Sequence, residues 1–296
     1  MVNEGLWALN TVAGPRFLGG GGPQKVLRTL DRSGHYQSIQ MSRIWLSLAV
    51  LSAGTAWGQS PAYTAADIVN ASNYAPGPFA PNSVLAIFGT NLSWSTRALR
   101  SDDIAGNTVP TQLSGVQVYV DNWPAPLLYV SASQINFIVP GNEISGDSTV
   151  RVVREGVTGP SVTVTLVEAA PALFALATGY AIAAHADMSL IAPDSPAHAG
   201  DLVVLYATGL GRTQPNPSPG VIPLSAAPIL WLANLTVSVD GTPLPSFRIK
   251  YAGVTPYSVG LYQVNVELPP DVGTDPEIRV AVGAQSSPAG LRLALQ

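Results

Sequence analysis

Two histidines with nearby hydroxyl and carboxyl groups are the residues of this sequence best suited to chemistry. His185 and His198 lie in a segment that also contains Asp187, Ser189, Asp194, Ser195 and Asp201. Histidine with serine and aspartate is the set that nucleophilic hydrolases use, and His-x-Asp could supply metal ligands. The spacing, however, fits no fixed metal-site pattern, and the sequence has neither a G-x-S-x-G nor an S-x-x-K motif. We therefore expect no catalytic residue and no metal site, and a secreted hydrolase is the weakest functional hypothesis.

A second group of oxygen ligands lies in the stretch PPDVGTDPE, residues 269–277, which contains Asp271, Asp275 and Glu277. Carboxylates clustered in a loop suit Ca²⁺. The stretch PGNEISGDS at 140–148 is a similar acidic turn between predicted strands. The preferred interpretation is therefore solvated turn residues, and calcium binding at 271–277 stays open.

Several aromatic residues are candidates for binding. Trp123 directly follows a predicted hairpin turn, and Tyr251, Tyr257 and Tyr262 crowd the stretch 250–262. Flat rings on a sheet edge could stack on sugars or anchor a protein partner. The tyrosines could instead pack between neighbouring parts of the fold. Trp123, Tyr251 and Tyr257 are the predicted binding residues.

An internal repeat organises the chain from about residue 84 onward. Four segments recur in the same order, at offsets between 118 and 129 residues. They are VLAIFGTNL (84–92) with LVVLYATGL (202–210), VQVYVDNWPAP (116–126) with LTVSVDGTPLP (235–245), QINFIVP (134–140) with QVNVELP (263–269), and VRVV (150–153) with IRVA (278–281). The offset increases from 119 at the second pair of segments to 129 at the third, which places a ten-residue insertion within 250–262 of the second copy. A duplicated domain explains this pattern.

Each copy is predicted to be a series of short antiparallel strands. Apolar residues alternate along Val116, Val118 and Val120, and the dipeptides Asp121-Asn122 and Asp240-Gly241 are typical of hairpin turns. Short strands at this spacing, without long amphipathic helices, predict an all-β chain of two tandem immunoglobulin-like β-sandwich repeats.

The paired motifs QINFIVP and QVNVELP are predicted to be one strand of that sandwich, seen twice. Alternation places Ile135, Phe137 and Val139 of the first copy on one face. The motif residues expected on the opposite face or at the strand end are Gln134, Asn136, Pro140, Gln263, Asn265 and Pro269. Ile138 corresponds to Glu267, so this second face is not uniformly buried.

Residues 41–58 have the pattern of a signal peptide. Arg43 precedes a short apolar run, and Ala56-Trp57-Gly58 supplies small residues for cleavage before Gln59. The run is too short to span a bilayer, so no transmembrane segment is expected in the mature chain. We expect residues 1–40 to be a mis-annotated or disordered extension. The predicted domains are 59–168 for the first repeat, 169–200 for an inter-repeat segment and 201–296 for the second repeat.

The composition limits where the protein can be located and which classes of partner it can bind. The sequence has no cysteine, so the stability of a secreted form must come from its core rather than from disulfides. The chain has a net charge of −4, and its residues from 59 onward carry nine basic and sixteen acidic groups. This balance excludes a basic nucleic-acid footprint and a cationic membrane face. We expect a bacterial periplasmic, extracellular or cell-surface protein without a cofactor.

Several stretches together resemble a known family. They are NASNYAPGPFAPNS (70–83), PAPLLYVSASQINFIVP (124–140), APALF (170–174), SPAHAGDLVVLYATGLG (195–211) and YAGVTPYSVGLYQVNVELP (251–269). They resemble the acidobacterial (Solibacter-type) secreted-protein C-terminal domain of unknown function, and single repeats resemble IPT/TIG immunoglobulin-like domains. Trp123 departs from this pattern, because a small residue is expected at that hairpin tip. The resemblance implies a surface or secreted β-sandwich and brings no catalytic residues.

These observations predict a non-enzymatic module for adhesion, assembly or protein–protein interaction. The alternative is a glycan-binding module that uses exposed aromatic residues such as Trp123. The expected partner is accordingly an unknown protein or polysaccharide of the cell envelope.

Overall fold

The computed structural model describes residues 59–296. The predicted extension 1–40 and the predicted signal peptide 41–58 lie outside the described residues. Within 59–296, no helix is long and apolar enough to cross a membrane.

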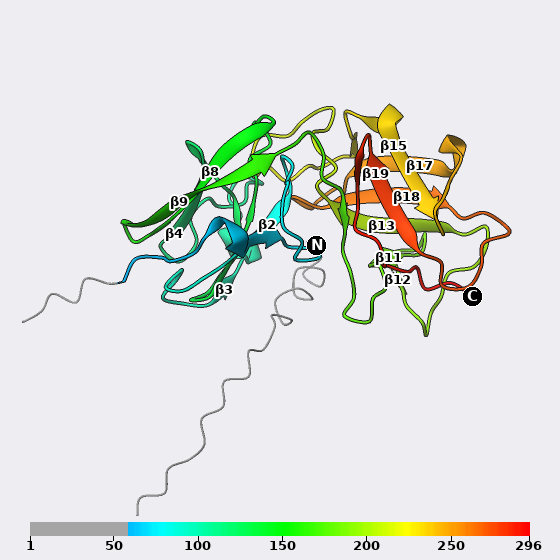
Figure 1. Ribbon diagram of the computed structural model, residues 1–296, viewed down its shortest axis with the longest axis horizontal. Helices are drawn as coiled ribbons and strands as arrows, with labels where there is room; N and C mark the ends of the chain where they lie inside the picture. The colour runs from blue at the N-terminus through cyan, green and yellow to red at the C-terminus, as the bar shows by residue number, and fades with distance from the viewer. Residues whose placement is uncertain (1–58) are drawn as a thin grey trace, which may run out of the picture. The chain divides into compact units, whose positions relative to one another are not determined.

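The first sandwich consists of two antiparallel sheets (Figure 1). One sheet has the order β1 (Ile68–Asn70), β2 (Val84–Phe88), β7 (Gln134–Ile138), β6 (Leu127–Val130) and β3 (Arg97–Ala98). The other has the order β5 (Trp123–Pro124), β4 (Val116–Val120), β8 (Gly146–Arg154) and β9 (Val157–Leu166). Two short 3₁₀ helices, η1 (Ala65–Asp67) and η2 (Ser101–Asp103), accompany these strands.

The second sandwich has the same plan. One sheet has the order β12 (Leu190–Ile191), β11 (Ala183–Ala184), β13 (Leu202–Thr208), β18 (Tyr262–Glu267), β17 (Ile249–Val254) and β14 (Ala227–Pro228), and β10 (Ala172–Leu173) also pairs with β13. The other sheet has the order β16 (Thr242–Pro243), β15 (Leu235–Val239), β19 (Ile278–Val282) and β20 (Gln285–Ser286). The 3₁₀ helices η3 (Leu232–Asn234) and η4 (Ser246–Arg248) lie between its strands.

The strand orders confirm the predicted fold class of tandem β-sandwich repeats. The run β2-β7-β6 corresponds to β13-β18-β17, and β5-β4-β8-β9 corresponds to β16-β15-β19-β20. Strands β10 to β12, which come from the segment 169–200, join the larger sheet of the second sandwich. The exact boundaries at 168 and 200 stay predictions.

Alternating side chains give each sandwich its own core. In β4, Val116, Val118 and Val120 are fully buried, as are Ile135 and Phe137 of β7. These residues belong to one apolar cluster, and their counterparts in β15 and β18 belong to another. Period-two alternation thus directs one face of each strand inward, as predicted.

The two predicted hairpin turns fold alike. Asp121 and Asp240 both have positive φ, 49° and 47°. In each copy the aspartate Oδ1 accepts a backbone N–H from the paired part of the sheet, from Thr149 in β8 at 2.7 Å and from Glu277 just before β19 at 2.8 Å. Aspartate tolerates this backbone region, and its carboxylate satisfies that N–H, which explains its place in both turns.

Candidate functional site

The glutamine and asparagine of the repeated motif bind each other. Gln134 Nε2 donates to Asn136 Oδ1 at 2.9 Å, and Gln263 Nε2 donates to Asn265 Oδ1 at 3.1 Å. Both pairs lie on the face of the strand opposite the core, two residues apart. The strands end before Pro140 and Pro269. The amide pairing is the same in both copies, so it accounts for the motif without a ligand.

Position 138 and its counterpart 267 differ because their surroundings differ. Ile138 is only 3% exposed and lies against Gly260 of the second sandwich, where an added Cβ would be 3.3 Å from Ile138 Cδ1. Glu267 instead forms ion pairs with Lys250 at 2.8 Å and Arg248 at 2.9 Å. The Lys250 ammonium, followed by Arg248, lowers the pKa of Glu267. One copy of this strand therefore faces the other sandwich, whereas the second copy faces charged side chains at the surface.

The two sandwiches meet at an interface that we call the joint. It is defined by an apolar cluster in which Ile222 and Val259 of the second sandwich pack with Ala71, Val84, Ala86, Val109, Leu128 and Ile138 of the first. The fully buried Thr208 lies beside this cluster. Its Oγ1 accepts the backbone N–H of Val84 at 3.0 Å and donates to the carbonyl of Gly260 at 3.1 Å. One hydroxyl thus satisfies a buried backbone group on each side of the joint.

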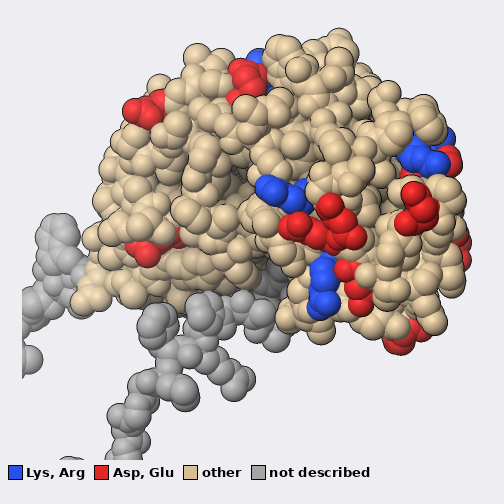
Figure 2. All heavy atoms as spheres, turned by 45° about the vertical axis from the view of Figure 1, so that its right-hand side comes forward, with Lys and Arg blue, Asp and Glu red and all other residues tan. Residues whose placement is uncertain are grey.

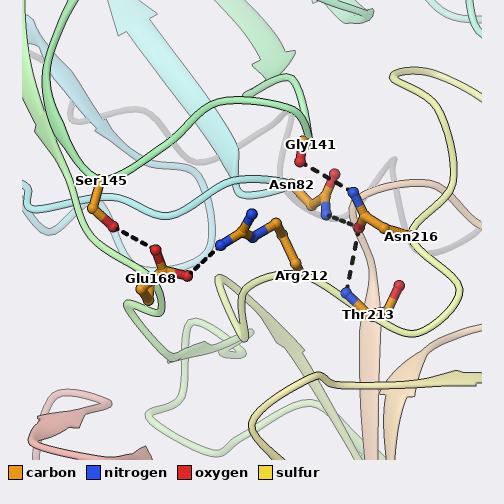
Figure 3. Close-up of polar contacts among 7 residues, drawn as sticks. All are labelled: Asn82, Gly141, Ser145, Glu168, Arg212, Thr213 and Asn216. Carbon is orange, nitrogen blue, oxygen red and sulfur yellow. Dashed lines mark hydrogen bonds and ion pairs between the residues drawn. The ribbon is translucent and has the colours of Figure 1, made fainter.

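Asparagines extend the joint at its polar edge. Asn216 Oδ1 accepts from Asn82 Nδ2 and from the backbone N–H of Thr213, both at 3.3 Å. Asn216 Nδ2 donates to the carbonyl of Gly141 at 3.1 Å (Figure 3). A second asparagine, Asn107, donates from Nδ2 to the carbonyl of Ile222 at 2.6 Å. Loops of both sandwiches are therefore tied together by side-chain amides.

An ion pair continues the polar edge. Arg212 Nη2 lies 2.8 Å from Glu168 Oε2, and Ser145 Oγ donates to Glu168 Oε1 at 2.9 Å (Figure 3). The hydrogen bond from Arg212 is the main cause that lowers the pKa of Glu168, so this carboxyl is ionised at neutral pH. Both side chains are partly exposed, so the pair adds little stability but holds the carboxylate in one orientation.

The three predicted binding aromatics lie in different places. Trp123 is in the short edge strand β5 of the first sandwich and is 53% exposed. Tyr257 lies in the loop between β17 and β18, is exposed, and donates its backbone N–H to the carbonyl of Pro223 at 2.7 Å. Tyr251, in β17, is half-buried, and its hydroxyl hydrogen-bonds the backbone of Ala227 and Val254. Tyr251 therefore fastens β14 to β17, and a binding role for Trp123, Tyr251 and Tyr257 stays a proposal.

Sequence reasoning passed over another tryptophan, Trp231. It precedes η3, is 41% exposed, and lines an open depression with Glu168, Asn234 and Gln285. A hydrogen bond from Trp231 also contributes to the lowered pKa of Glu168. In the sequence, Trp231 lies between Leu230 and Leu232 and looks like part of an apolar strand. Glu168 lies more than sixty residues away, so no local motif signals the pairing.

The structure gathers the histidine, serine and aspartate candidates only in part. His185, Asp187, Ser189, Ser195 and Asp201 line one open depression. The hydroxyl of Ser189, however, donates to Asp187 Oδ1 at 2.6 Å, and His185 Nε2 lies 3.3 Å from the backbone carbonyl of Ser195.

The other histidine forms a local turn. His198 donates its backbone N–H to Asp201 Oδ2 at 2.8 Å, and its Nδ1 lies 3.6 Å from the same oxygen. Within residues 59–296, no serine hydroxyl is hydrogen-bonded to an imidazole nitrogen. The nucleophile–base contact on which serine hydrolases depend is therefore not formed by these residues.

Two of the three carboxylates in the 271–277 loop, those of Asp275 and Glu277, bind groups of the chain itself. Asp275 accepts from the hydroxyl of Tyr180 at 2.8 Å and from the backbone N–H of Leu295 at 3.2 Å. Glu277 Oε1 accepts the backbone N–H of Gly290 at 2.7 Å. No group of three or more His, Cys, Asp or Glu residues in the described part of the chain could hold a metal ion.

One carboxyl group of the first sandwich is buried. Glu143 is 6% exposed, and its Oε1 has no hydrogen-bond partner among the described residues. Burial, followed by the charge of Asp121, raises the pKa of Glu143. Burial acts in the same direction on Asp121, but hydrogen bonds from Thr149, Ser148 and Glu143 outweigh it and lower the pKa of Asp121. Of the two carboxyl groups, Glu143 therefore takes up a proton at the higher pH, and Asp121 stays ionised to lower pH.

Charged groups are sparse on the face that Figure 2 shows. Most of this face is uncharged, and the visible Lys and Arg side chains lie beside Asp and Glu rather than forming a basic patch. Such a face offers nothing to a polyanion.

Comparisons with known proteins support the fold. Residues 69–167 match the IPT/TIG domain family, which supports the TIG-like part of the resemblance, whereas the acidobacterial domain family stays a prediction. No curated protein matches the chain.

Three solved structures illustrate the structural likeness. The surface glycan-binding protein PbSGBP-B from Prevotella bryantii is 13% identical, with 79% of this chain and 42% of that chain covered and a TM-score of 0.25. SGBP-B of a Bacteroides ovatus mixed-linkage glucan utilization locus is 9% identical, with 73% and 44% covered and a TM-score of 0.28. Domains 5–6 of the S-layer protein SbsC are 10% identical, with 79% and 98% covered and a TM-score of 0.26. The chain spans less than half the length of the two glycan-binding proteins.

Proposed function

We propose that this chain is a non-enzymatic, secreted or cell-surface β-sandwich module that serves adhesion, assembly or protein–protein interaction in a bacterial envelope. The observation that carries the proposal is the joint. Thr208 bonds Val84 and Gly260 inside it, and asparagines bond its edge, so hydrogen bonds and apolar packing join the two sandwiches. Joining the sandwiches restricts the spacing of their surface loops, which reduces the conformational entropy lost when a partner binds several of them.

The arrangement of polar side chains favours binding over catalysis. Ser189 is occupied by Asp187, and His185 faces a backbone carbonyl, so neither is set up as a nucleophile or its base. The carboxylates of Asp275 and Glu277 accept hydrogen bonds from tyrosine and backbone donors. The purified chain and the variant His185→Ala should therefore hydrolyse ester and glycoside substrates at the same background rate. A lower rate in the variant would instead support the hydrolase hypothesis.

Exposed aromatic residues are the proposed contacts. Trp123 and Tyr257 present large rings at a sheet edge and a loop. Rings of this kind often supply the central contacts of protein interfaces. The test is co-purification of the full chain with envelope proteins of the parent cell, compared with Trp123→Ala/Tyr257→Ala and with the control Phe247→Ala, which removes another exposed ring. Loss of the same partner in the double variant and its retention in the control are expected; retention in all three would contradict this role.

Glycan binding is the second candidate. Exposed tryptophans favour it, because an indole ring provides a flat apolar face and a polar N–H at one edge. A glycan array probed with the full chain decides between the two: binding to no polysaccharide would remove this candidate.

A further inference from the structure

The depression beside Trp231 combines the groups that a sugar ring needs. It is lined by one flat aromatic side chain, one carboxylate and two amides, which belong to Trp231, Glu168, Asn234 and Gln285. The depression lies where the end of the first sandwich meets η3 and the β19–β20 turn of the second.

Backbone contacts hold the segment that carries Trp231. Ile229, two residues earlier, is buried, and Leu230 donates its N–H to the carbonyl of Arg212 at 2.8 Å. Asn234 donates its N–H to the carbonyl of Trp231 at 2.9 Å, and Gly283 donates to the carbonyl of Asn234 at 3.0 Å. The backbone on both sides of Trp231 and the turn that leads to Gln285 are therefore held in place, which lowers the cost of ordering them when a ligand binds.

The polar groups of the depression are oriented and have capacity to spare. Glu168 is held by Arg212 and Ser145 and also receives a hydrogen bond from Trp231, and a carboxylate can accept about four hydrogen bonds, so capacity remains for a hydroxyl donor. The side-chain amides of Asn234 and Gln285 belong to exposed residues that line the depression. Each amide can both donate and accept, as a sugar hydroxyl requires.

Other exposed tryptophans lack this combination. The ring of Trp94 is covered by the Arg154 guanidinium, 3.8 Å from the ring centroid, and its Nε1 donates to Glu155. Trp123 lies in the edge strand β5, next to Pro124 and paired with Val120. Among the tryptophans of residues 59–296, Trp231 is the one that shares a depression with a carboxylate and exposed amides.

The geometry points to a binding site for a neutral polysaccharide, in which a sugar ring stacks on Trp231 and its hydroxyls bond Glu168, Asn234 and Gln285. A ring with polar groups around it is the usual design of small-ligand sites. Glu168 lines the depression whereas Arg212 does not, so an acidic sugar would face a carboxylate there, which disfavours its binding. This inference rests on the proposed non-enzymatic binding function and gives it a ligand class.

The test is electrophoresis of the full chain through native gels that contain one polysaccharide each. The neutral probes are mixed-linkage β-glucan, arabinoxylan and starch, and polygalacturonate is the acidic comparison. We expect at least one neutral gel to retard the chain and polygalacturonate not to do so. Trp231→Ala should weaken that binding about tenfold or more, the effect of deleting a central aromatic contact. Trp231→Phe should retain part of it.

The matched control is Phe247→Ala, which removes an exposed aromatic ring at another site and should bind like the parent. Thermal unfolding of each variant verifies that it is folded. Equal retardation of Trp231→Ala and the parent, stronger binding to polygalacturonate, or no retardation in any neutral gel would overturn the inference. If envelope proteins still co-purify with the chain in that case, the proposed function stands without this site; if they do not, both fail.

Discussion

Thr208 Oγ1 lies 3.0 Å from the backbone nitrogen of Val84 and accepts its hydrogen bond across the joint. The same hydroxyl donates to the carbonyl of Gly260. Because Thr208 is fully buried, water cannot replace either bond. The two sandwiches are therefore joined by a hydrogen bond inside an apolar contact, and the first three predictions concern this joint.

Thr208→Val should destabilise the chain strongly for so small a change. Valine has nearly the shape of threonine but leaves the N–H of Val84 and the carbonyl of Gly260 without partners. Each unsatisfied buried group costs about 1–3 kcal/mol. Urea unfolding measures the loss, and Thr208→Ser, which keeps the hydroxyl, is the control. Equal midpoints for the valine and serine variants would contradict this prediction.

Gly260→Ala should be more destabilising than Gly241→Ala, although both glycines have positive φ, +68° and +76°. A Cβ at position 241 meets nothing within 4 Å, so that variant shows the backbone cost alone, about 1 kcal/mol. A Cβ at position 260 would be 2.7 Å from Val84 Cγ2, which adds about 1–3 kcal/mol of overpacking. Unfolding free energies of the two variants check the difference. Val84→Ala should relieve part of the Gly260→Ala cost, and a lack of any relief would place the strain elsewhere.

Exchanging the equivalent residues 138 and 267 should have opposite consequences. Ile138→Glu places a carboxylate without a cationic partner in the joint, which we expect to cost about 3 kcal/mol or more. Glu267→Ile removes only surface ion pairs with Lys250 and Arg248, so a small change is expected. Thermal unfolding compares the two. Similar melting temperatures would mean that the joint does not form in solution.

Glu143→Gln should stabilise the chain increasingly as the pH rises. The folded state raises the pKa of Glu143 above its usual 4.5, so its favourable contribution is complete below that value and is lost as the pH rises through the raised pKa. Glutamine does not ionise and avoids this loss. Unfolding free energies of parent and variant, measured from about pH 4 to about pH 8, should diverge toward high pH.

Asp121→Asn tests the cause of that effect. Asparagine keeps the Oδ1 acceptor for Thr149 but removes the neighbouring charge that raises the pKa of Glu143. The pH-dependent gain from Glu143→Gln should therefore be smaller in this background. An unchanged gain would leave burial as its whole cause.

The alternation of Val116, Val118 and Val120 and the turn residues Asp121 and Asp240 were sufficient to predict strands, hairpins and a duplicated sandwich. These signals are local, because a strand's period and a turn's backbone depend on neighbouring residues. The same two-residue period predicted that the side chains of Gln134 and Ile135 point to opposite faces of the strand. That Gln134 bonds Asn136 rather than a ligand was not predictable, since several partners were in reach.

The sequence by itself determined the fold class and the repeat, because the alternation of apolar side chains in a strand and the residue types that turns require are local properties of the sequence. Tertiary structure alone decided which copy of the strand faces the joint, and hence why Ile138 and Glu267 differ. It also brought Trp231 to Glu168. Such contacts join residues from different strands and loops, and their geometry depends on how two independent cores pack against each other.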